Sequence, residues 1–245
     1  MGRFEGRVAL VTGSSSGIGA ATARALDAEG ARVVVNSSSS VEAGEAVAAS
    51  LEDGAYVQAD ISQAGDCEKL VAATVERFGR LDVLVNNAGV TQVIPHEDLD
   101  AVTDEVFRRI LEVNVLGTWR LIRLAMPHLR ADGGGAVVNV SSIAGIRPMG
   151  SSIPYGVSKA AINHMTMWLA KVTGPDVTVN AVAPGLIRTP WTEDWPHHQV
   201  IGDVAPAGRS GEPGDVASVV LQLAASAYVT GQVVVIDGGL TLAMT

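Results

Sequence analysis

Short apolar runs alternate with longer segments of helical periodicity along the whole chain. Each run is apolar at consecutive positions rather than at alternate ones, which is typical of strands in a parallel sheet covered by helices on both faces. The predicted strands cover residues 8–12, 32–36, 56–59, 83–86, 137–140, 177–183 and 233–236. The predicted helices cover residues 20–29, 41–51, 66–78, 104–129, 154–172 and 213–225.

This alternation predicts a doubly wound α/β fold of the Rossmann type, with helices on both faces of the sheet and right-handed crossovers. A chain of 245 residues can bury a substantial core, and neither a shift in composition nor an internal repeat divides it. We therefore expect a single domain over residues 1–245. The one serine run, residues 37–40, is too short to be a linker.

Charge and cysteine content exclude several classes of function. The net charge of −9 argues against binding to the phosphate backbone of nucleic acids and to an anionic membrane surface. No apolar stretch approaches the length of a membrane-spanning helix. The single cysteine, Cys67, cannot form a disulfide or a cysteine-based metal site within one chain. We expect a cytosolic protein with no metal, no nucleic-acid partner and no membrane partner.

A glycine-rich segment, residues 13–19, lies between the first predicted strand and the first predicted helix, and we call it the glycine turn. Glycines allow a sharp turn, a close approach of the backbone to a ligand and tight packing of the helix on the sheet. The amino end of the helix then offers free N–H groups and a positive dipole to a pyrophosphate. The candidate contacts are Gly13, Ser15, Ser16, Gly17, Ile18 and Gly19.

Tyr155 and Lys159 are four residues apart in a predicted helix, so their side chains lie on one face. A tyrosine hydroxyl in water has a pKa of about 10, too high for proton exchange at neutral pH. A nearby positive charge favours the phenolate, so we expect Lys159 to lower the pKa of Tyr155. Such a pair, with Ser142 thirteen residues upstream, suits proton exchange with a carbonyl or alcohol oxygen.

Motifs along the whole chain resemble those of the short-chain dehydrogenase/reductase family, with a general resemblance to its 3-oxoacyl-(acyl-carrier-protein) reductases. The resemblance implies seven parallel strands, a nicotinamide cofactor and, commonly, a tetramer. The matching residues are the glycine turn, Asn-Asn-Ala-Gly at 86–89, Asn114, Ser142, Tyr155, Lys159 and Pro184-Gly185.

The resemblance implies a catalytic role for four side chains. Tyr155 would protonate the carbonyl oxygen as hydride arrives from the nicotinamide, and Ser142 would hold that oxygen by a hydrogen bond. Lys159 would also bind the nicotinamide ribose. Asn114 would anchor a water that relays protons to Lys159; the alternative is an amide that only satisfies nearby backbone groups. Ser141 competes with Ser142, but strand alternation points the two side chains to opposite sides.

Further cofactor contacts follow from the same resemblance. Residues 87–89 would line the cofactor channel, whereas Asn86 would tie the fourth strand to the turn that begins at Thr12. Asp60 would contact the adenine, with Ile61 beside it, and the segment after Pro184-Gly185 would contact the nicotinamide. The candidate contacts are Asp60, Ile61, Asn87, Ala88, Gly89, Pro184, Gly185, Ile187 and Thr189, with Tyr155 and Lys159.

The end of the second predicted strand indicates which nicotinamide cofactor binds. An acidic residue there accepts hydrogen bonds from the ribose 2′-OH of NAD and repels the 2′-phosphate of NADP. This chain has Asn36, Ser37 and Ser38 at that place, with no acid. NADP enzymes of the family often carry an arginine in the glycine turn, where this chain has Ser16, and Arg32 is at the far end of the strand. We favour NADP over NAD, with use of both left open.

Three connections should form the substrate pocket, because ligands of open α/β sheets bind beyond the carboxyl ends of the strands. They cover residues 90–96, 143–153 and 186–209. The second supplies the apolar side chains of Ile143, Ile146, Pro148, Met149 and Ile153. The third is long, and we expect a mobile substrate lid. Trp191 and Trp195 in it either close over an apolar substrate or pack into a subunit contact. His197 and His198 have no third ligand nearby, which argues against a metal site.

The predicted helix at 154–172 carries a second apolar stripe. Because one face already serves the site and the core, a second stripe indicates a partner helix. We expect a homodimer or homotetramer through this helix and the one at 104–129. The stripe consists of Ala161, Met165, Trp168 and Val172.

The predicted function is the interconversion of a ketone and a secondary alcohol, with a small, fairly apolar substrate. One alternative is a 3-oxoacyl-(acyl-carrier-protein) reductase. The basic carrier contacts of that subgroup correspond to Gly133 and Asp176 here, although Arg130 and Lys171 lie close in sequence. A second alternative is a cofactor-binding regulator without activity. A third is an epimerase, a dehydratase or a decarboxylating enzyme of the same fold, which usually has a longer chain with a larger C-terminal substrate region than this one.

Overall fold

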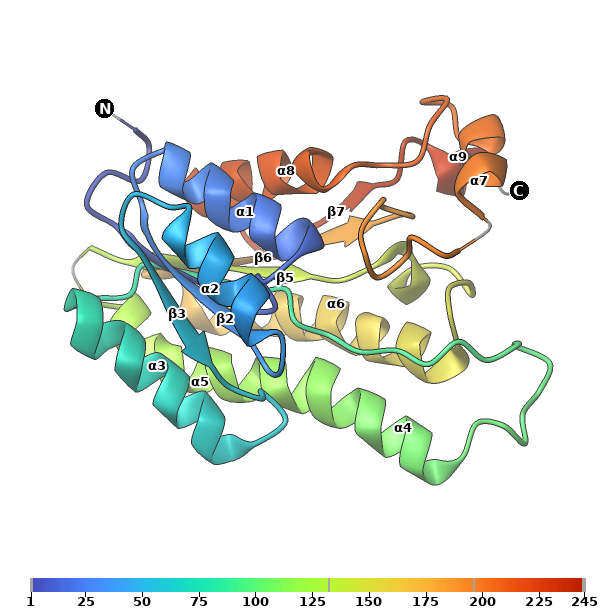
Figure 1. The fold of residues 1–245 in the computed structure, drawn as a ribbon, viewed down its shortest axis with the longest axis horizontal. Helices are drawn as coiled ribbons and strands as arrows, with labels where there is room; N and C mark the ends of the chain where they lie inside the picture. Colours follow the sequence, from blue (N-terminus) through green and yellow to red (C-terminus); the bar gives the residue numbers. More distant parts are fainter. Residues whose placement is uncertain (1, 132, 196, 244–245) are drawn as a thin grey trace.

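The computed structural model describes residues 2–131, 133–195 and 197–243. Within them, seven strands form one parallel sheet in the order β3-β2-β1-β4-β5-β6-β7 (Figure 1). The predicted doubly wound α/β fold is therefore confirmed. The strands are β1 (Val8–Val11), β2 (Arg32–Ser37), β3 (Gly54–Gln58), β4 (Val83–Asn86), β5 (Gly135–Val140), β6 (Val177–Pro184) and β7 (Val233–Ile236).

The strand side chains point alternately into two apolar cores, one on each face of the sheet. In β1, Ala9 and Val11 belong to one core, and Val8 and Leu10 belong to the other. The first core is covered by α1 (Gly17–Ala28), α2 (Val41–Ala49) and α8 (Pro213–Ala225). The second is covered by α3 (Ala64–Phe78), α5 (Thr118–Leu129) and α6 (Ile153–Thr173) (Figure 1). Burial on both faces explains the uninterrupted apolar runs.

The helix predicted over residues 104–129 contains a π-helical segment that the sequence did not reveal. The chain is α-helical in α4 (Asp104–Leu111) and α5, and the segment between them, η1 (Glu112–Gly117), has π-type hydrogen bonding. Backbone angles remain helical at Leu111 and Thr118, so the helix continues through the segment. A π segment in an α-helix often marks a functional position, and Asn114 lies inside this one.

Other differences concern element ends and short helices. The helix α1 begins at Gly17 rather than at residue 20, and β3 begins at Gly54 rather than at residue 56. Three short helices were not predicted, because so few residues carry little periodicity and depend on tertiary packing. They are the 3₁₀ turn η2 (Ile143–Gly145), α7 (His197–Val204) inside the predicted lid, and α9 (Leu240–Ala243).

The arrangement of the strands places a crevice at one edge of the sheet. The strand β1 lies between β2 and β4, so β2 and β3 extend the sheet on one side of β1 and the later strands extend it on the other side. Such a switch point leaves a ligand crevice beyond the carboxyl ends of the strands. Among the described residues, no helix is long and apolar enough to cross a membrane.

Candidate active site

A cavity of about 870 Å³ opens at the carboxyl ends of the strands. It is lined by the glycine turn, the ends of β2 and β3, the segments after β4, β5 and β6, and one face of α6. Every predicted cofactor contact except Gly19 lines this cavity, and so do three of the four predicted catalytic residues. Asn114 is the fourth and lies behind the cavity wall.

Two glycines of the glycine turn lie so close to neighbouring atoms that a side chain would not fit at their positions. At Gly13, where φ is +59°, a Cβ would lie 2.8 Å from the Cα of Ala88. At Gly19, a Cβ would lie 2.6 Å from the side-chain nitrogen of Asn87. Gly19 therefore packs α1 against the segment after β4, while Gly17 and Ile18 present the amino end of α1 to the cavity. A helix amino end in this position suits a pyrophosphate.

Asn87, rather than Asn86, holds the segment after β4 to the glycine turn. Its side-chain amide donates to the carbonyl oxygens of Thr12 and Gly13, each at 2.9 Å, and its backbone N–H donates to the Thr12 hydroxyl at 3.0 Å. The prediction that gave this role to Asn86 was wrong. The Asn86 amide donates at 2.9 Å to the side chain of Asn139, within the sheet.

The residues at the end of β2 differ in how open they are. The Asn36 amide donates to the carbonyl oxygens of Val57 and Ala59, both at 3.1 Å, so it is occupied in joining β2 to β3. The Ser37 hydroxyl hydrogen-bonds that of Tyr56 at 2.8 Å. Ser38 is exposed at the rim of the cavity. Of these three side chains, only that of Ser38 is freely available to a ligand.

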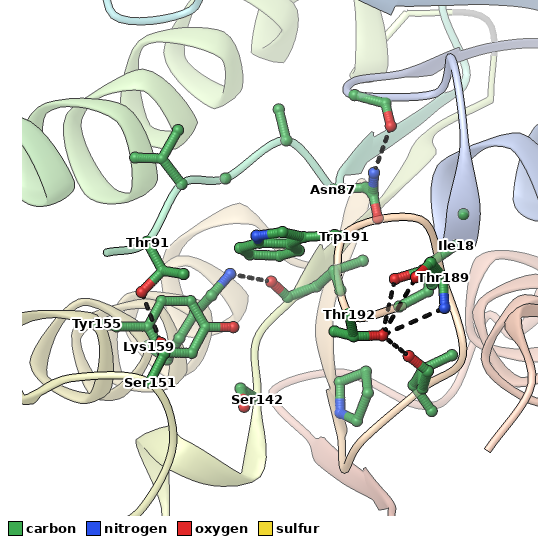
Figure 2. A pocket seen from close by; sticks show the side chains of 18 of the residues that line it. Ile18, Asn87, Thr91, Ser142, Ser151, Tyr155, Lys159, Thr189, Trp191 and Thr192 are labelled. Carbon is green, nitrogen blue, oxygen red and sulfur yellow. Dashed lines mark hydrogen bonds between the residues drawn. The ribbon is translucent and has the colours of Figure 1, made fainter. Parts of the chain in front are cut away.

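The Tyr155, Lys159 and Ser142 side chains meet at one end of the cavity (Figure 2). One turn of α6 separates the first two, and the Lys159 Nζ lies 5.6 Å from the centre of the Tyr155 ring. The Lys159 ammonium donates to the carbonyl oxygen of Val140 at 2.8 Å, which fixes it beneath the cavity. Ser142 follows β5 in an extended conformation, and its hydroxyl accepts a hydrogen bond from the Ala144 N–H at 3.1 Å.

Burial sets the protonation of this group. It raises the pKa of the Tyr155 phenol to about 12, although the Ser142 side chain acts in the opposite direction. It lowers the pKa of the Lys159 ammonium to about 8. The pKa of Tyr155 is therefore raised overall rather than lowered as expected, because removal of the phenol from water is the dominant effect.

The side chains of Asn114 and Ser141 are both occupied by hydrogen bonds within the protein. The Asn114 side chain accepts a hydrogen bond from the Val90 N–H at 2.8 Å and donates to the Val90 carbonyl at 3.0 Å. It also donates to the Ser158 hydroxyl at 3.0 Å. Ser141 points away from Ser142, and its hydroxyl donates to the Lys159 carbonyl oxygen at 3.1 Å. Ser141 is thus occupied in attaching β5 to α6.

The predicted lid supplies an aromatic wall to the cavity. Trp191 and Trp195 both line it, and the Trp191 ring meets that of Tyr155 edge to face, with centroids 6.3 Å apart (Figure 2). Both tryptophans thus face the cavity, while Trp191 is also 51% exposed, and the alternative of a subunit contact stays a prediction. His198 is buried between the Ser210 hydroxyl and the Thr192 carbonyl, at 3.1 and 2.9 Å. Among the described residues, no cluster of side chains could hold a metal ion.

The substrate end of the cavity agrees only in part with the predicted one. Ile143 and Met149 line it, but Ile146, Pro148 and Ile153 do not. The reason is that these three residues face outward, and each is more than one-third exposed. Sequence reasoning also missed lining residues contributed by elements it did not place at the site. They are Arg109, Val113 and Leu240.

The fold and this cavity together define a dinucleotide-dependent oxidoreductase, and comparisons with known proteins give its family. A family model described as enoyl-(acyl carrier protein) reductase matches residues 13–241. "Granaticin polyketide synthase putative ketoacyl reductase 2" of Streptomyces violaceoruber is 57% identical over 96% of each chain. The 3-oxoacyl-(acyl-carrier-protein) reductase of Thermotoga maritima is 38% identical over 98% of this chain and 100% of its own. The solved structure of levodione reductase has a TM-score of 0.88 at 34% identity, covering 98% of this chain and 99% of that one.

The chain belongs to the short-chain dehydrogenase/reductase family. It is an NAD(P)-dependent oxidoreductase that interconverts an alcohol and a carbonyl group. The alternative of a regulator without activity is thereby set aside.

Proposed function

We propose that this protein reduces a ketone in an oxoacyl or polyketide-type substrate to a secondary alcohol, in the cytosol and with NADPH. The observation that carries the proposal is the position of Tyr155 beside Ser142 and Lys159 at the end of the cavity. Because burial raises its pKa to about 12, the Tyr155 phenol is fully protonated at neutral pH but is a weak acid. It can donate its proton to a ketone oxygen that becomes strongly basic as hydride arrives at the neighbouring carbon. The relatives from S. violaceoruber and T. maritima support the substrate class.

The residues present fit a dinucleotide. The glycine turn and the amino end of α1 would hold the pyrophosphate, and Asp60 and Ile61 would lie at the adenine. Ile187 and Thr189 would contact the nicotinamide carboxamide. When bound, the reduced nicotinamide supplies a hydride to the carbonyl carbon.

The chain's own residues would manage the proton and the developing charge. Ser142 donates a hydrogen bond to the carbonyl oxygen and keeps it within reach of Tyr155. The Tyr155 hydroxyl transfers its proton to that oxygen as negative charge develops there. The Lys159 ammonium then stabilises the phenolate. Asn114 acts as a positioning residue, because its amide holds both backbone groups of Val90 in place; its role in a water relay stays a prediction.

The segment at 186–209 would act as the substrate lid, with Trp191 as its inner face. An aromatic ring edge-on to Tyr155 excludes water from the proton donor and offers a flat apolar wall to the substrate.

The carrier-bound form of a 3-oxoacyl chain is a second candidate substrate, favoured by the T. maritima relative. The acidic charge of this chain favours the free or short-thioester form instead.

The test is consumption of NADPH, followed by its absorbance, with a panel of ketones, 3-oxoacyl esters and thioesters, free and carrier-bound. We expect turnover with at least one oxoacyl compound and the reverse reaction with the matching alcohol. An absence of turnover over the whole panel, with NADPH bound, would contradict the proposal.

The preference for NADP is the second part of the proposal. Ser16, Ser38 and Ser40 offer hydroxyls at the cavity, and neither Ser37 nor Ser38 presents a carboxylate to a 2′-phosphate. We expect a higher kcat/KM with NADPH than with NADH. The substitution Ser38→Asp should reverse this preference, because a carboxylate accepts from the ribose 2′-OH and repels the phosphate. Ser39→Asp adds the same charge at an exposed position outside the cavity and should leave the preference unchanged. A higher kcat/KM with NADH in the unmodified enzyme would refute this part.

A further inference from the structure

Two further hydroxyl groups, distinct from those of Tyr155 and Ser142, face each other at the substrate end of the cavity. The Thr91 Oγ1 and the Ser151 Oγ are 2.6 Å apart (Figure 2). Thr91 follows β4 and Ser151 precedes α6, and both line the cavity that contains Tyr155. Gly150 is in van der Waals reach of the Tyr155 ring, since a Cβ at Gly150 would lie 3.7 Å from the Tyr155 Cδ1. The hydroxyl pair therefore lies beside the proposed proton donor.

The hydroxyl pair is not needed to join the two loops. The Ile94 N–H already donates to the Ser151 carbonyl at 2.9 Å, and the His96 ring hydrogen-bonds the Gly150 carbonyl at 2.9 Å. These two bonds fix the loops to one another without either hydroxyl. A structural role alone thus leaves the two polar side chains on the cavity wall unexplained.

The hydrogen-bonding capacity of the pair is not used up within the described residues. Two hydroxyls carry two protons and four lone pairs, and the bond between them uses one proton. The remaining proton has only a marginal acceptor in the protein, the Gln92 carbonyl oxygen, 3.5 Å from the Thr91 Oγ1. The side chains that share this end of the cavity are mostly apolar, among them Val93, Met149 and Trp191. An acceptor on the substrate would complete the pair.

We propose that Thr91 and Ser151 form a subsite for a second oxygen of the substrate. The favoured substrate class is a ketone that carries a further carbonyl oxygen near the reacting one, as in a 3-oxoacyl compound, rather than a simple ketone. This inference rests on the proposed function, because the reacting carbonyl is the one held by Ser142 and Tyr155. The pair supplies binding and orientation and takes no part in proton transfer.

The test compares two substrates of equal chain length, ethyl 3-oxobutanoate and 2-heptanone, which differ in the ester group. Thr91→Val and Ser151→Ala each remove one hydroxyl with little change in shape. We expect each substitution to lower kcat/KM for ethyl 3-oxobutanoate about fivefold relative to kcat/KM for 2-heptanone, which is the effect of losing one neutral hydrogen bond. The kcat/KM for 2-heptanone itself should be unchanged. Ser152→Ala is the matched control, because this neighbouring hydroxyl is buried and lies outside the cavity.

The outcomes separate the subsite from the function. If both substrates lose activity together in the two variants, the pair only joins the loops and the subsite is refuted. An unchanged ratio refutes it as well, while the proposed function stands. If the unmodified enzyme binds NADPH but reduces neither compound, nor any other ketone, the proposed function fails and the subsite with it. Activity toward 2-heptanone also shows that each variant is folded.

Discussion

At the scale of single residues, the site depends on burying groups that water would otherwise stabilise. Lys159 is 5% exposed, and the loss of hydration on burial lowers its pKa to about 8. The positive charge that would stabilise the Tyr155 phenolate is therefore itself destabilised by burial. Tyr155 shows the complementary effect, since burial favours its neutral form. Both shifts keep the donor protonated and its neighbour close to titration near neutral pH.

The lowered pKa of Lys159 predicts a pH dependence for reduction. Below about pH 8 the ammonium is charged and can stabilise the phenolate left after proton transfer; above it the charge is lost. We expect kcat/KM for the ketone, at saturating NADPH, to fall as pH rises through about 8. Lys159→Met should show low activity without this step. A rate of reduction that climbs from pH 7 to pH 9 in the unmodified enzyme would contradict the assignment.

The spacing of Tyr155 and Lys159, together with the resemblance to the short-chain dehydrogenase/reductase family, predicted most of the site. Tyr155, Lys159 and Ser142 meet as predicted because a helix places residues four apart on one face and Ser142 ends a neighbouring strand. The direction of the Tyr155 pKa could not be predicted, because it depends on how deeply the surrounding loops bury the ring. The roles of Asn86 and Asn87 were exchanged for a different reason. The side chains of successive residues at a strand end point in different directions, so an error of one residue in the predicted strand end assigns the role to the wrong amide.

At the scale of elements, the π-helical segment η1 joins α4 to α5 beside the active site. It contains Asn114, whose amide holds Val90, and Gly117, which packs on the end of β3. The apolar spacing of residues 104–129 predicted a helix correctly. It could not predict the π segment, because apolar periodicity identifies a helix but does not distinguish α-type from π-type hydrogen bonding over so few residues.

Gly117 offers a test of this packing. A Cβ there would lie 2.8 Å from the carbonyl oxygen of Ile61, a backbone atom that cannot easily move. Gly117→Ala should therefore lower the free energy of unfolding by about 1–3 kcal/mol, measured by urea denaturation. Gly65→Ala in α3 is the control, because a Cβ there has no atom within 4 Å and alanine favours a helix. Equal or greater stability of Gly117→Ala would show that η1 is not tightly packed.

At the scale of the whole molecule, an apolar surface on α5 and α6 is left uncovered. Of the stripe predicted on α6, Met165 packs against the core, whereas Trp168 and Val172 are 55% and 60% exposed. On the neighbouring helical region, Leu116 and Trp119 are each 42% exposed. Exposed tryptophans on adjacent helices are typical of a protein interface. The sequence revealed the stripe but not which part of it the core uses, because that depends on the rotation of α6.

We expect this surface to join copies of the chain into a homodimer or homotetramer. Light scattering at micromolar concentration should give a multiple of the 25.3 kDa chain mass. The double substitution Trp168→Glu and Val172→Glu should shift the mass toward the monomer, because charges are costly to bury in an interface. Tyr228→Glu, at a fully exposed position, is the control and should not. A monomeric unmodified protein would contradict this expectation.

The most direct test of the central claim, that Tyr155 donates the proton, is the substitution Tyr155→Phe, which removes only the hydroxyl. The account predicts that kcat for ketone reduction falls at least about a hundredfold, the usual contribution of a general acid, while NADPH binding, measured by its fluorescence, is unchanged. Tyr228→Phe, at an exposed position, should retain full activity. Near-normal turnover in Tyr155→Phe would contradict the account.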